Sequence, residues 1–448
     1  MGSFGRQSVI RNKHLPSGTA LTRDVTGAAV YCRQGGFFLV LRLFVLFSIL
    51  ATLLALQSIF SLQGGYRFLR FVRRSLRKPP GDYLPPVALV IPCKGLSQDF
   101  EVNLTRFLTQ DYPAYELVFV VASQEDPAHR CILESLRTWA GDFPELHATS
   151  VVIAGRSEVR GEKVNNLLHG LTAVSRRAEV LVFADADARP KPDWLRCLVS
   201  PLADRSVTVS TGFRWYLPGF SFASQVRAAW DTSIATMLGE HDHNFAWGGS
   251  MALRVETFER LRLAERYWAH TVSDDYAVTR AVRDAGGRIR FEPRCLLASR
   301  EESSFRDFVR WANRQIIITR VYAASLWTVG LASHGLYCVT FLLGLLLLAR
   351  SGSSMPERLA IIAALLFIVS LGLAKGYIRY VAAGELFPEE KTTLRSYGPR
   401  YWQLAPVVPW LMLYNFVIAS FSRRIEWRGT HYVLKSRNEV AVVRRDKT

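Results

Sequence analysis

Apolar residues along the chain follow two patterns: long uninterrupted runs near both ends, and short runs separated by helical stretches between them. The run from Leu43 to Leu62 holds twenty residues without a charge. A helix of that length spans about 30 Å, the thickness of the hydrocarbon core of a bilayer. The pattern predicts a transmembrane helix over residues 43–62, after an N-terminal basic segment over residues 1–42 and before a basic, proline-containing linker over residues 63–86.

Basic residues are distributed unevenly around this first run. Within about twenty residues on each side, the basic residues are Arg67, Arg70, Arg73, Arg74, Arg77 and Lys78 after the run, and Arg23, Arg33 and Arg42 before it. Lys and Arg accumulate on the cytoplasmic side of membrane segments. We therefore expect an integral membrane protein whose central region faces the cytoplasm.

Three apolar stretches follow residue 320: Val321 to Ala349, Leu359 to Ala374, and Tyr401 to Ser422. We assign residues 321–422 to a C-terminal membrane region and residues 423–448 to a basic tail. Three crossings would leave that tail outside, against the charge rule. We therefore expect the last stretch, which contains Pro406 and Pro409, to be re-entrant or interfacial, and the tail to be cytoplasmic.

The region over residues 87–303 has a different pattern, in which short apolar, β-rich runs alternate with helical stretches such as Lys163 to Val174 and Asp193 to Leu202. The runs are Val87 to Ile91, Leu117 to Val121, Ser150 to Ala154, Val180 to Phe183 and Val207 to Thr211. Continuous apolar strands separated by helices indicate a mainly parallel sheet covered on both faces. Ligands of such sheets gather at the carboxyl ends of the strands.

Two carboxylates follow the fourth run, at the point where a buried strand ends. Asp185 and Asp187 are separated by one residue. Such a pair can hold a hard divalent cation, which in turn binds a diphosphate. Ordinary turn acids at a strand end have the same spacing. The pair therefore indicates a metal site only in combination with its position at a strand end and with polar residues after the other strands.

Two further polar elements lie after other strands. Asp126, in Glu125-Asp126-Pro127, can accept hydrogen bonds from a ribose or a nucleobase, or can form an ordinary turn before proline. Gly161 permits close backbone approach, and Lys163 stands near the free N–H groups of a helix start. The second arrangement suits a phosphate, although a plain start of a helix has the same composition.

Acidic residues also open the helical stretch Ala277 to Arg283, in the sequence Ser273-Asp274-Asp275-Tyr276. Acids in a first helical turn are favoured by the helix dipole and can cap the helix. A carboxylate facing the cleft can instead serve as a general base. Both interpretations remain open for Asp275 on the local sequence alone.

Residues 304–320 have the spacing of an amphipathic helix that lies on the membrane surface. One face carries Arg306, Arg310 and Arg314, and another carries Phe305, Phe308, Val309 and Ala312. This helix can act purely as an interfacial anchor. Alternatively, Trp311 borders an acceptor site and Arg310 neutralises a leaving diphosphate.

Composition narrows the possible partners. The chain has 448 residues, 49% of them hydrophobic, with 56 Lys and Arg against 38 Asp and Glu for a net charge of +18. This composition excludes a disordered chain. Anionic lipid head groups and nucleotide phosphates both attract such a charge, so we expect no nucleic-acid partner on this ground. The six cysteines form no C-x-x-C pair and indicate neither a disulfide framework nor structural zinc.

As a set, these elements resemble membrane glycosyltransferases of family 2 in the broad sense, and within it the ceramide glucosyltransferase group of family 21. The resemblance rests on the D1, D2, D3 and (Q/R)xxRW motifs, to which Asp126, Asp185 with Asp187, Asp275, and Arg310 with Trp311 are similar. Lys94-Gly95 after the first strand and the element Lys163 to Asn166 are further likenesses. Position 307 is Asp where the last motif has Gln or Arg. The full D-x-D resembles the general family more than the eukaryotic ceramide enzymes, which leaves the acceptor lipid open.

The resemblance implies an α/β fold: a GT-A-type nucleotide-sugar-binding domain with a mainly parallel sheet, an N-terminal transmembrane helix, and C-terminal interfacial and transmembrane helices. It implies inverting transfer of a hexose from a UDP-sugar, UDP-glucose or a relative, to a lipid hydroxyl such as that of ceramide. Mg²⁺ or Mn²⁺ would bind Asp185 and Asp187, and Asp275 would be the base. The donor would contact Lys94, Asp126, Lys163, Asp185, Arg310 and Trp311.

Two other functions remain as alternatives. A processive polysaccharide synthase usually carries more membrane helices, which form its polymer channel. A non-catalytic transporter component or scaffold would place ionisable residues at the middle of the membrane, whereas the acidic motifs of this chain lie in its soluble region. The sequence does not determine the oligomeric state.

Overall fold

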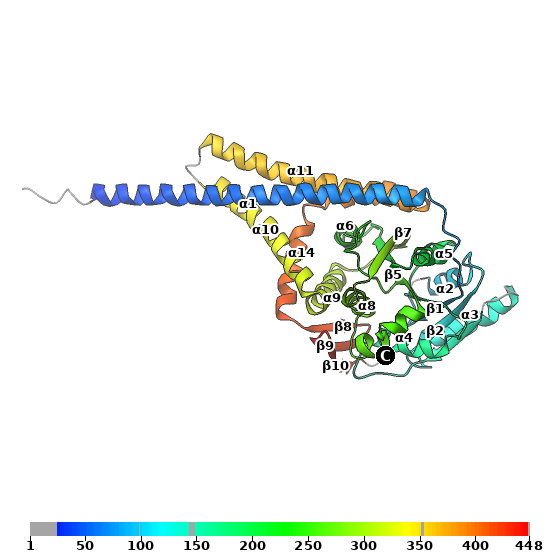
Figure 1. The fold of residues 1–448 in the computed structure, drawn as a ribbon. Coiled ribbons are helices and arrows are strands. Elements are labelled where there is room, and N and C mark those ends of the chain that lie inside the picture. The colour runs from blue at the N-terminus through cyan, green and yellow to red at the C-terminus, as the bar shows by residue number, and fades with distance from the viewer. Residues whose placement is uncertain (1–24, 98, 143–147, 351–353, 447–448) are drawn as a thin grey trace, which may run out of the picture.

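The computed structural model describes the chain except residues 1–24, 98, 143–147, 351–353 and 447–448, and except the side chains of residues 25–40 and 140–142. A central α/β domain lies beside two long helices that run side by side in the same direction, and a small C-terminal sheet packs against the same domain (Figure 1). Each of these parts contributes to the site described below.

The central sheet has seven strands in the order β3-β2-β1-β4-β6-β5-β7. The strands are β1 Val87–Pro92, β2 Tyr115–Val121, β3 Thr149–Ile153, β4 Val180–Ala184, β5 Val207–Tyr216, β6 Ser250–Arg254 and β7 Arg288–Ser299. Strands β3, β2, β1 and β4 are parallel, β6 runs antiparallel between β4 and β5, and β5 is parallel to β7. The predicted α/β class with a mainly parallel sheet is confirmed.

Helices cover both faces of the sheet, because successive side chains of each strand point to opposite faces. In β1, Val87, Leu89 and Ile91 pack into one core, while Ala88 and Val90 pack into the other. The helices of the first core are α2 Phe100–Leu108, α3 Pro127–Asp142 and α5 Trp194–Val199, and those of the second are α4 Glu162–Gly170, α7 Val255–Arg260, α8 Asp274–Asp284 and a π-helix over Leu263–Trp268.

Three helices of the described chain are long and apolar enough to cross a membrane: α1, Val25–Leu76, with its candidate span beginning at Leu41, α10, Ala324–Ala349, and α11, Met355–Leu386. The proline-containing stretch forms the shorter apolar helix α14, Val408–Phe421, which is not among these candidate spans. Helix α1 continues beyond the apolar run through much of the expected linker. Its residues Phe68 and Val72 are buried against the central α/β domain, next to Trp215 and Phe291.

Several helices connect the membrane region to the sheet. They are α6 Phe222–Ala235, α9 Phe305–Tyr322, α12 Lys391–Tyr397 and α13 Arg400–Gln403, and a 3₁₀ turn at Pro388–Glu390 leads into α12. Two other 3₁₀ turns, Leu171–Ala173 and Ser200–Ala203, follow helices of the central domain. The predicted amphipathic helix corresponds to α9. It packs between α6 and α14 through buried residues such as Phe308, Ala312 and Ile316, so this face is covered by protein.

The expected basic tail folds as a three-stranded antiparallel sheet of β8 Arg424–Trp427, β9 Thr430–Ser436 and β10 Glu439–Arg445. Alternate residues of these strands, namely Ile425, Tyr432, Leu434 and Val440, are buried with residues of α9 and α14. In β9 the burial alternates, although Val433 between Tyr432 and Leu434 is also apolar, so the sequence shows no clear alternation there. This sheet therefore lies on the same side of the membrane region as the central α/β domain (Figure 1).

Candidate active site

A single cavity of about 1480 Å³ lies at the carboxyl ends of β1 and β4. Its wall includes the loops after these strands, the start of α8, and residues of α9. The same cavity continues between α1, α10 and α11, where Gln57, Ser333 and Lys375 line it. It therefore connects the polar end of the central α/β domain with the three candidate membrane helices.

Five charged side chains meet beyond the end of β4. Arg214 of β5 donates to Asp187 from Nη2 to Oδ1 at 2.6 Å and from Nη1 to Oδ2 at 3.1 Å. Its Nη2 also lies 3.3 Å from Asp185 Oδ2. Lys163 Nζ lies 2.8 Å from Asp185 Oδ1 and 3.2 Å from Asp274 Oδ2. The sequence had indicated Asp185, Asp187 and Lys163, but not Arg214 or the inward position of Asp274.

Burial and neighbouring charge act in opposite directions on these groups. Burial alone raises the pKa of Asp187, but the Arg214 guanidinium outweighs it and holds the pKa below its usual value. For Asp274, burial dominates and raises the pKa to about 6, although Lys163 opposes the shift. Burial would lower the pKa of Lys163, yet the surrounding carboxylates raise it above its usual value. The cluster thus holds two firmly charged cations and one weakly acidic carboxyl.

The acidic pair has the chemistry of a site for a hard divalent cation. Asp185 and Asp187 present carboxylate oxygens to the cavity, and oxygens are the ligands that Mg²⁺ and related ions prefer. In the ligand-free chain, Arg214 and Lys163 supply the positive charge next to these oxygens. The residues therefore fit a metal that shares or takes over the contacts of Arg214.

Two consecutive glycines allow the backbone before β6 to approach this cluster. A Cβ atom at Gly248 would lie 1.9 Å from Asp274 Oδ2, and one at Gly249 would lie 2.7 Å from Asp185 Oδ2. Any larger residue would therefore displace the carboxylates. The dipeptide was visible in the sequence, but its role depends on β6, which the apolar runs did not reveal.

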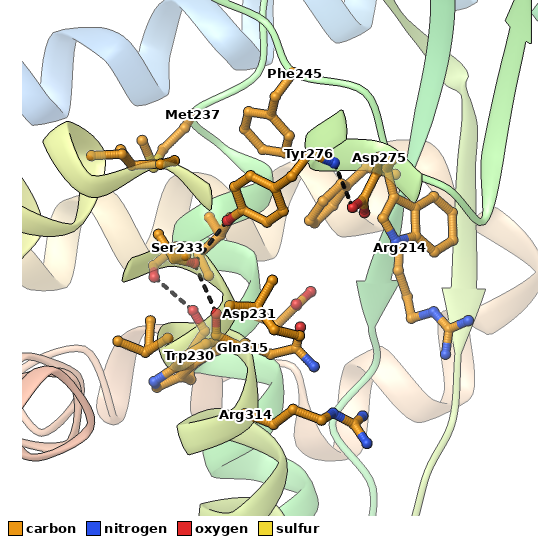
Figure 2. Close-up of a pocket in the computed structure, with 18 of the residues that line it drawn as sticks. Arg214, Trp230, Asp231, Ser233, Met237, Phe245, Asp275, Tyr276, Arg314 and Gln315 are labelled. Carbon is orange, nitrogen blue, oxygen red and sulfur yellow. Dashed lines mark hydrogen bonds between the residues drawn. The ribbon is translucent and has the colours of Figure 1, made fainter. Parts of the chain in front are cut away.

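The start of α8 separates the two acids of the Asp274-Asp275 pair. Ser273 caps the helix, and its hydroxyl accepts a hydrogen bond from Tyr276 N at 3.4 Å. The Oδ1 atom of Asp275 accepts hydrogen bonds from Tyr276 N, at 2.7 Å, and from the Ser273 hydroxyl. Figure 2 shows Asp275 at the cavity, near Arg214 and Tyr276. Both side chains therefore accept from the Tyr276 N–H, and Ser273 remains available as a cap when the Asp275 carboxylate is replaced.

The loop after β1 is held by Asp126, which accepts hydrogen bonds from Gly95 N at 2.8 Å and Ala128 N at 2.9 Å. Gly95 has a φ of +58°, which favours glycine. Asp126 does not line the cavity, whereas Lys94 does, and Lys94 Nζ lies 2.9 Å from Glu162 Oε2. The structure therefore places Asp126 behind the loop that carries Lys94.

Helix α9 presents a different arginine to the cavity from the one expected. Trp311 lines the cavity, with its ring centroid 5.2 Å from that of Trp230. Arg310 does not, and its side chain is 59% exposed beside Asp307. Arg314 and Gln315, about one turn beyond Trp311, line the cavity below Asp231 in Figure 2. Burial lowers the pKa of Arg314 to about 10.

The C-terminal sheet adds a cation that the sequence did not indicate. Arg428 lines the cavity, and its guanidinium donates to the Lys94 carbonyl oxygen. It forms the β8–β9 turn with Gly429, and their φ angles are +44° and +75°. A type of turn with two positive φ angles favours Asn, Asp or Gly. The unfavourable backbone conformation of an arginine here suggests that its side chain is needed at the cavity.

Asp231 of α6 is a second site residue that the sequence did not reveal. Its side chain lines the cavity and is buried, next to Trp230. Burial raises its pKa to about 7, although Arg214 and Arg227 oppose this shift. It lies in the largely buried helix α6, in a segment with no recognisable motif, so only the tertiary structure identifies it.

Comparisons with known proteins agree with this arrangement. The model of glycosyl transferase family 21 matches residues 48–440. Over 116 residues the chain is 28% identical to ceramide glucosyltransferase 1 of Caenorhabditis elegans. That match spans 26% of this chain and only 23% of the relative.

Solved structures with a similar overall arrangement include a mannosyltransferase of Pyrobaculum calidifontis in complex with GDP-Man and Mn²⁺. It is 20% identical, with a TM-score of 0.44, and the alignment covers 84% of this chain and 97% of that one. Glucosyl-3-phosphoglycerate synthase of Mycobacterium tuberculosis, in complex with Mn²⁺, UDP-Glc and phosphoglyceric acid, is 15% identical with a TM-score of 0.37. That alignment covers 55% of this chain and 85% of the synthase.

Proposed function

Because this chain belongs to glycosyl transferase family 21, we propose that it is an inverting membrane glycosyltransferase that moves a hexose from a UDP-sugar to a lipid hydroxyl. Glucose and ceramide are the first candidates, since the Caenorhabditis elegans relative is a ceramide glucosyltransferase. The observation that carries the proposal is the single cavity that extends from Asp185 and Asp187 to the membrane helices α1, α10 and α11.

At the donor end, cations surround the position where a diphosphate would lie. Lys163, Arg214 and Arg428 line this part of the cavity, and Arg314 enters it from α9. Positive groups fixed in place stabilise the charge that develops on a departing diphosphate. A Mg²⁺ or Mn²⁺ ion bound by Asp185 and Asp187 would add Lewis-acid stabilisation of the same charge. Lys94 borders the donor, and Asp126 positions the loop that carries it.

At the reacting centre, Asp275 is the residue that we assign as the general base. Inversion needs a hydroxyl that attacks opposite the leaving group and a base that takes its proton. Both hydrogen bonds to the Asp275 carboxylate end on Oδ1. We therefore assign Oδ2 to the proton of the acceptor hydroxyl, while the buried Asp274 remains with Lys163 in the donor cluster.

The acceptor end explains why the enzyme would be an integral membrane protein. A lipid tail leaves the bilayer only at a cost of about 0.8 kcal/mol per CH₂, so its hydroxyl is best met at the membrane surface. The cavity reaches that surface between three helices that can span a membrane. The excess of basic residues after the first span supports a cytoplasmic catalytic domain.

The proposal can be tested by supplying the purified full chain with Mn²⁺, a total lipid extract, and one radiolabelled nucleotide sugar at a time. UDP-glucose, UDP-galactose and GDP-mannose form a suitable panel. We expect a UDP-sugar to label one lipid, which identifies donor and acceptor together. Label in a water-soluble polymer would favour a polysaccharide synthase, and the absence of any labelled product with every donor would contradict the proposal.

A further inference from the structure

Two basic side chains of α11 lie in the cavity without an acidic partner. Arg379 is only 5% exposed, and its Nε atom is buried with no hydrogen-bond partner in the part of the chain that the structure describes. Lys375 donates to the hydroxyl of Ser61 on α1. Neither residue forms an ion pair with any described carboxylate. Two buried cations are costly unless an anion compensates them.

Three cations of the cavity wall near the acidic pair are compensated by carboxylates. Lys94 pairs with Glu162, Lys163 with Asp185 and Asp274, and Arg214 with both acids of the D-x-D pair. Lys375 and Arg379 are four residues apart on one helix and therefore lie on the same face. This face lines the cavity in the same region as Gln57 and Ser333, which are hydrogen-bonded to each other. The pair is thus the uncompensated charge at the membrane end of the cavity.

The depth of this pair corresponds to the head-group region of a bilayer. Ser61, which contacts Lys375, is one residue before the end of the apolar run that we assigned to the hydrocarbon core. A little further along α11, Ala382 and Leu386 are already buried against the catalytic domain. Lys375 and Arg379 therefore lie where a lipid that enters between the helices would place its head group.

We propose that Lys375 and Arg379 bind the phosphate-bearing head group of an anionic membrane lipid inside the cavity. An arginine fork matches phosphate oxygens, and a lysine supplies a point charge beside it. The lipid is either the acceptor itself or a phospholipid that lies next to the acceptor. This inference rests on the proposed function only in that the same cavity admits the acceptor.

The test compares two fluorescent lipids with identical acyl chains, phosphatidic acid and diacylglycerol, for binding to the full chain in neutral detergent. We expect the protein to prefer phosphatidic acid at least tenfold. Lys375→Gln and Arg379→Gln should each reduce this preference. Arg395→Gln, which changes an exposed arginine of α12 outside the cavity, should retain it.

Binding of UDP in the presence of Mn²⁺ serves as the check that each variant is folded. If Arg379→Gln fails this check, Lys375→Gln alone decides the result. Equal binding of both lipids to the unmodified chain, or an unchanged preference in a folded Lys375→Gln variant, would overturn the proposal. Neither outcome would affect the glycosyltransferase assignment, which depends on donor binding and transfer.

A second arm identifies the source of the phosphate. The lipid product of the transfer reaction is separated on an anion-exchange resin. A product that carries phosphate shows that the acceptor occupies the Lys375–Arg379 site. A neutral product, together with the preference for phosphatidic acid, shows that a phospholipid occupies the site beside the acceptor.

Discussion

At the scale of single residues, the charge cluster beyond β4 depends on each of its members. Arg214 holds Asp187 through two hydrogen bonds, and Lys163 joins Asp185 to Asp274. Removing one partner of such a buried pair leaves the other charge uncompensated. Substitutions here should therefore affect donor binding as well as the chemical step.

Asp187→Asn should abolish turnover and weaken the metal dependence of UDP binding, because the D-x-D pair loses one of its two ionised ligands. Titration of the full chain with UDP, with and without Mn²⁺, measures this. Asp111→Asn, an exposed residue outside the cavity, serves as the control. Unchanged metal dependence in Asp187→Asn would remove the metal assignment.

Asp231 should make stability depend on pH. Its pKa is raised from 3.8 to about 7 in the folded chain, so the folded state retains a proton that the unfolded state releases. The associated stability is fully present below the unfolded pKa and is lost as the pH rises towards 7. The effect amounts to at most about 4 kcal/mol, at about 1.4 kcal/mol per pKa unit.

The measurement compares the Tm of the full chain with that of Asp231→Asn, in the same detergent, at about pH 5 and about pH 8. The native chain should lose more Tm between these two values than the variant, because asparagine cannot titrate. Equal losses would show that Asp231 does not carry the predicted shift.

Several site residues were predictable because they follow apolar runs or carry a family motif. Asp185, Asp187, Lys163 and Lys94 all line the cavity. The motif placed Arg310 next to Trp311, and neighbours in a helix point about 100° apart. Trp311 faces the cavity, whereas Arg310 is exposed beside Asp307. Arg314, at a spacing of three residues from Trp311, occupies that face instead.

At the scale of elements, the C-terminal sheet is the largest difference between expectation and structure. The five apolar runs predicted β1 to β5 because buried parallel strands contain few charges. Charged residues interrupt β7 and lie at the ends of β10, and β9 is short and carries polar residues at both ends, so composition alone suggested a tail. Tyr432 and Arg428 of this sheet nevertheless reach the Glu162 and Lys94 backbones.

Arg428→Gln should weaken UDP binding by about tenfold to a hundredfold, because a charge-assisted contact with a phosphate contributes on the order of 1.5–3 kcal/mol. Arg424→Gln, an exposed arginine of the same sheet outside the cavity, should leave it unchanged. UDP titration of both variants in Mn²⁺ is the measurement. If Arg428→Gln binds UDP as the native chain does, the sheet has no role in holding the donor.

At the scale of the whole molecule, the number of membrane crossings determines whether the central sheet and the C-terminal sheet lie on the same side of the membrane. Helices α10 and α11 form one pair of candidate crossings after the catalytic domain, and α14 is too short to add a third. The C-terminal sheet packs on α9 and therefore lies on the side of the catalytic domain. The distribution of basic residues in the sequence predicted an even number of crossings after the catalytic domain. The sequence did not predict the packing of α1 against β7.

Cysteine labelling in intact cells tests this topology. In a Cys32→Ser background, Glu134→Cys and Ser436→Cys should react with an impermeant reagent only after the membrane is opened. Met355→Cys, at the start of α11, should react from outside. The five native cysteines that the structure describes are buried and should stay unreactive. Labelling of position 436 from outside would contradict the cytoplasmic assignment.

The central claim is that Asp275 takes the proton of a lipid hydroxyl at the point where donor and acceptor meet. Its most direct test is the single-turnover transfer rate of Asp275→Asn in the full chain, with UDP affinity measured in parallel. Ser273 still caps α8 in this variant, so we expect a folded protein with nearly native UDP affinity and a transfer rate lower by about a hundredfold or more. Near-native transfer by Asp275→Asn would contradict the claim, and if Asp274→Asn were the variant with the lost chemical step, the base would be Asp274.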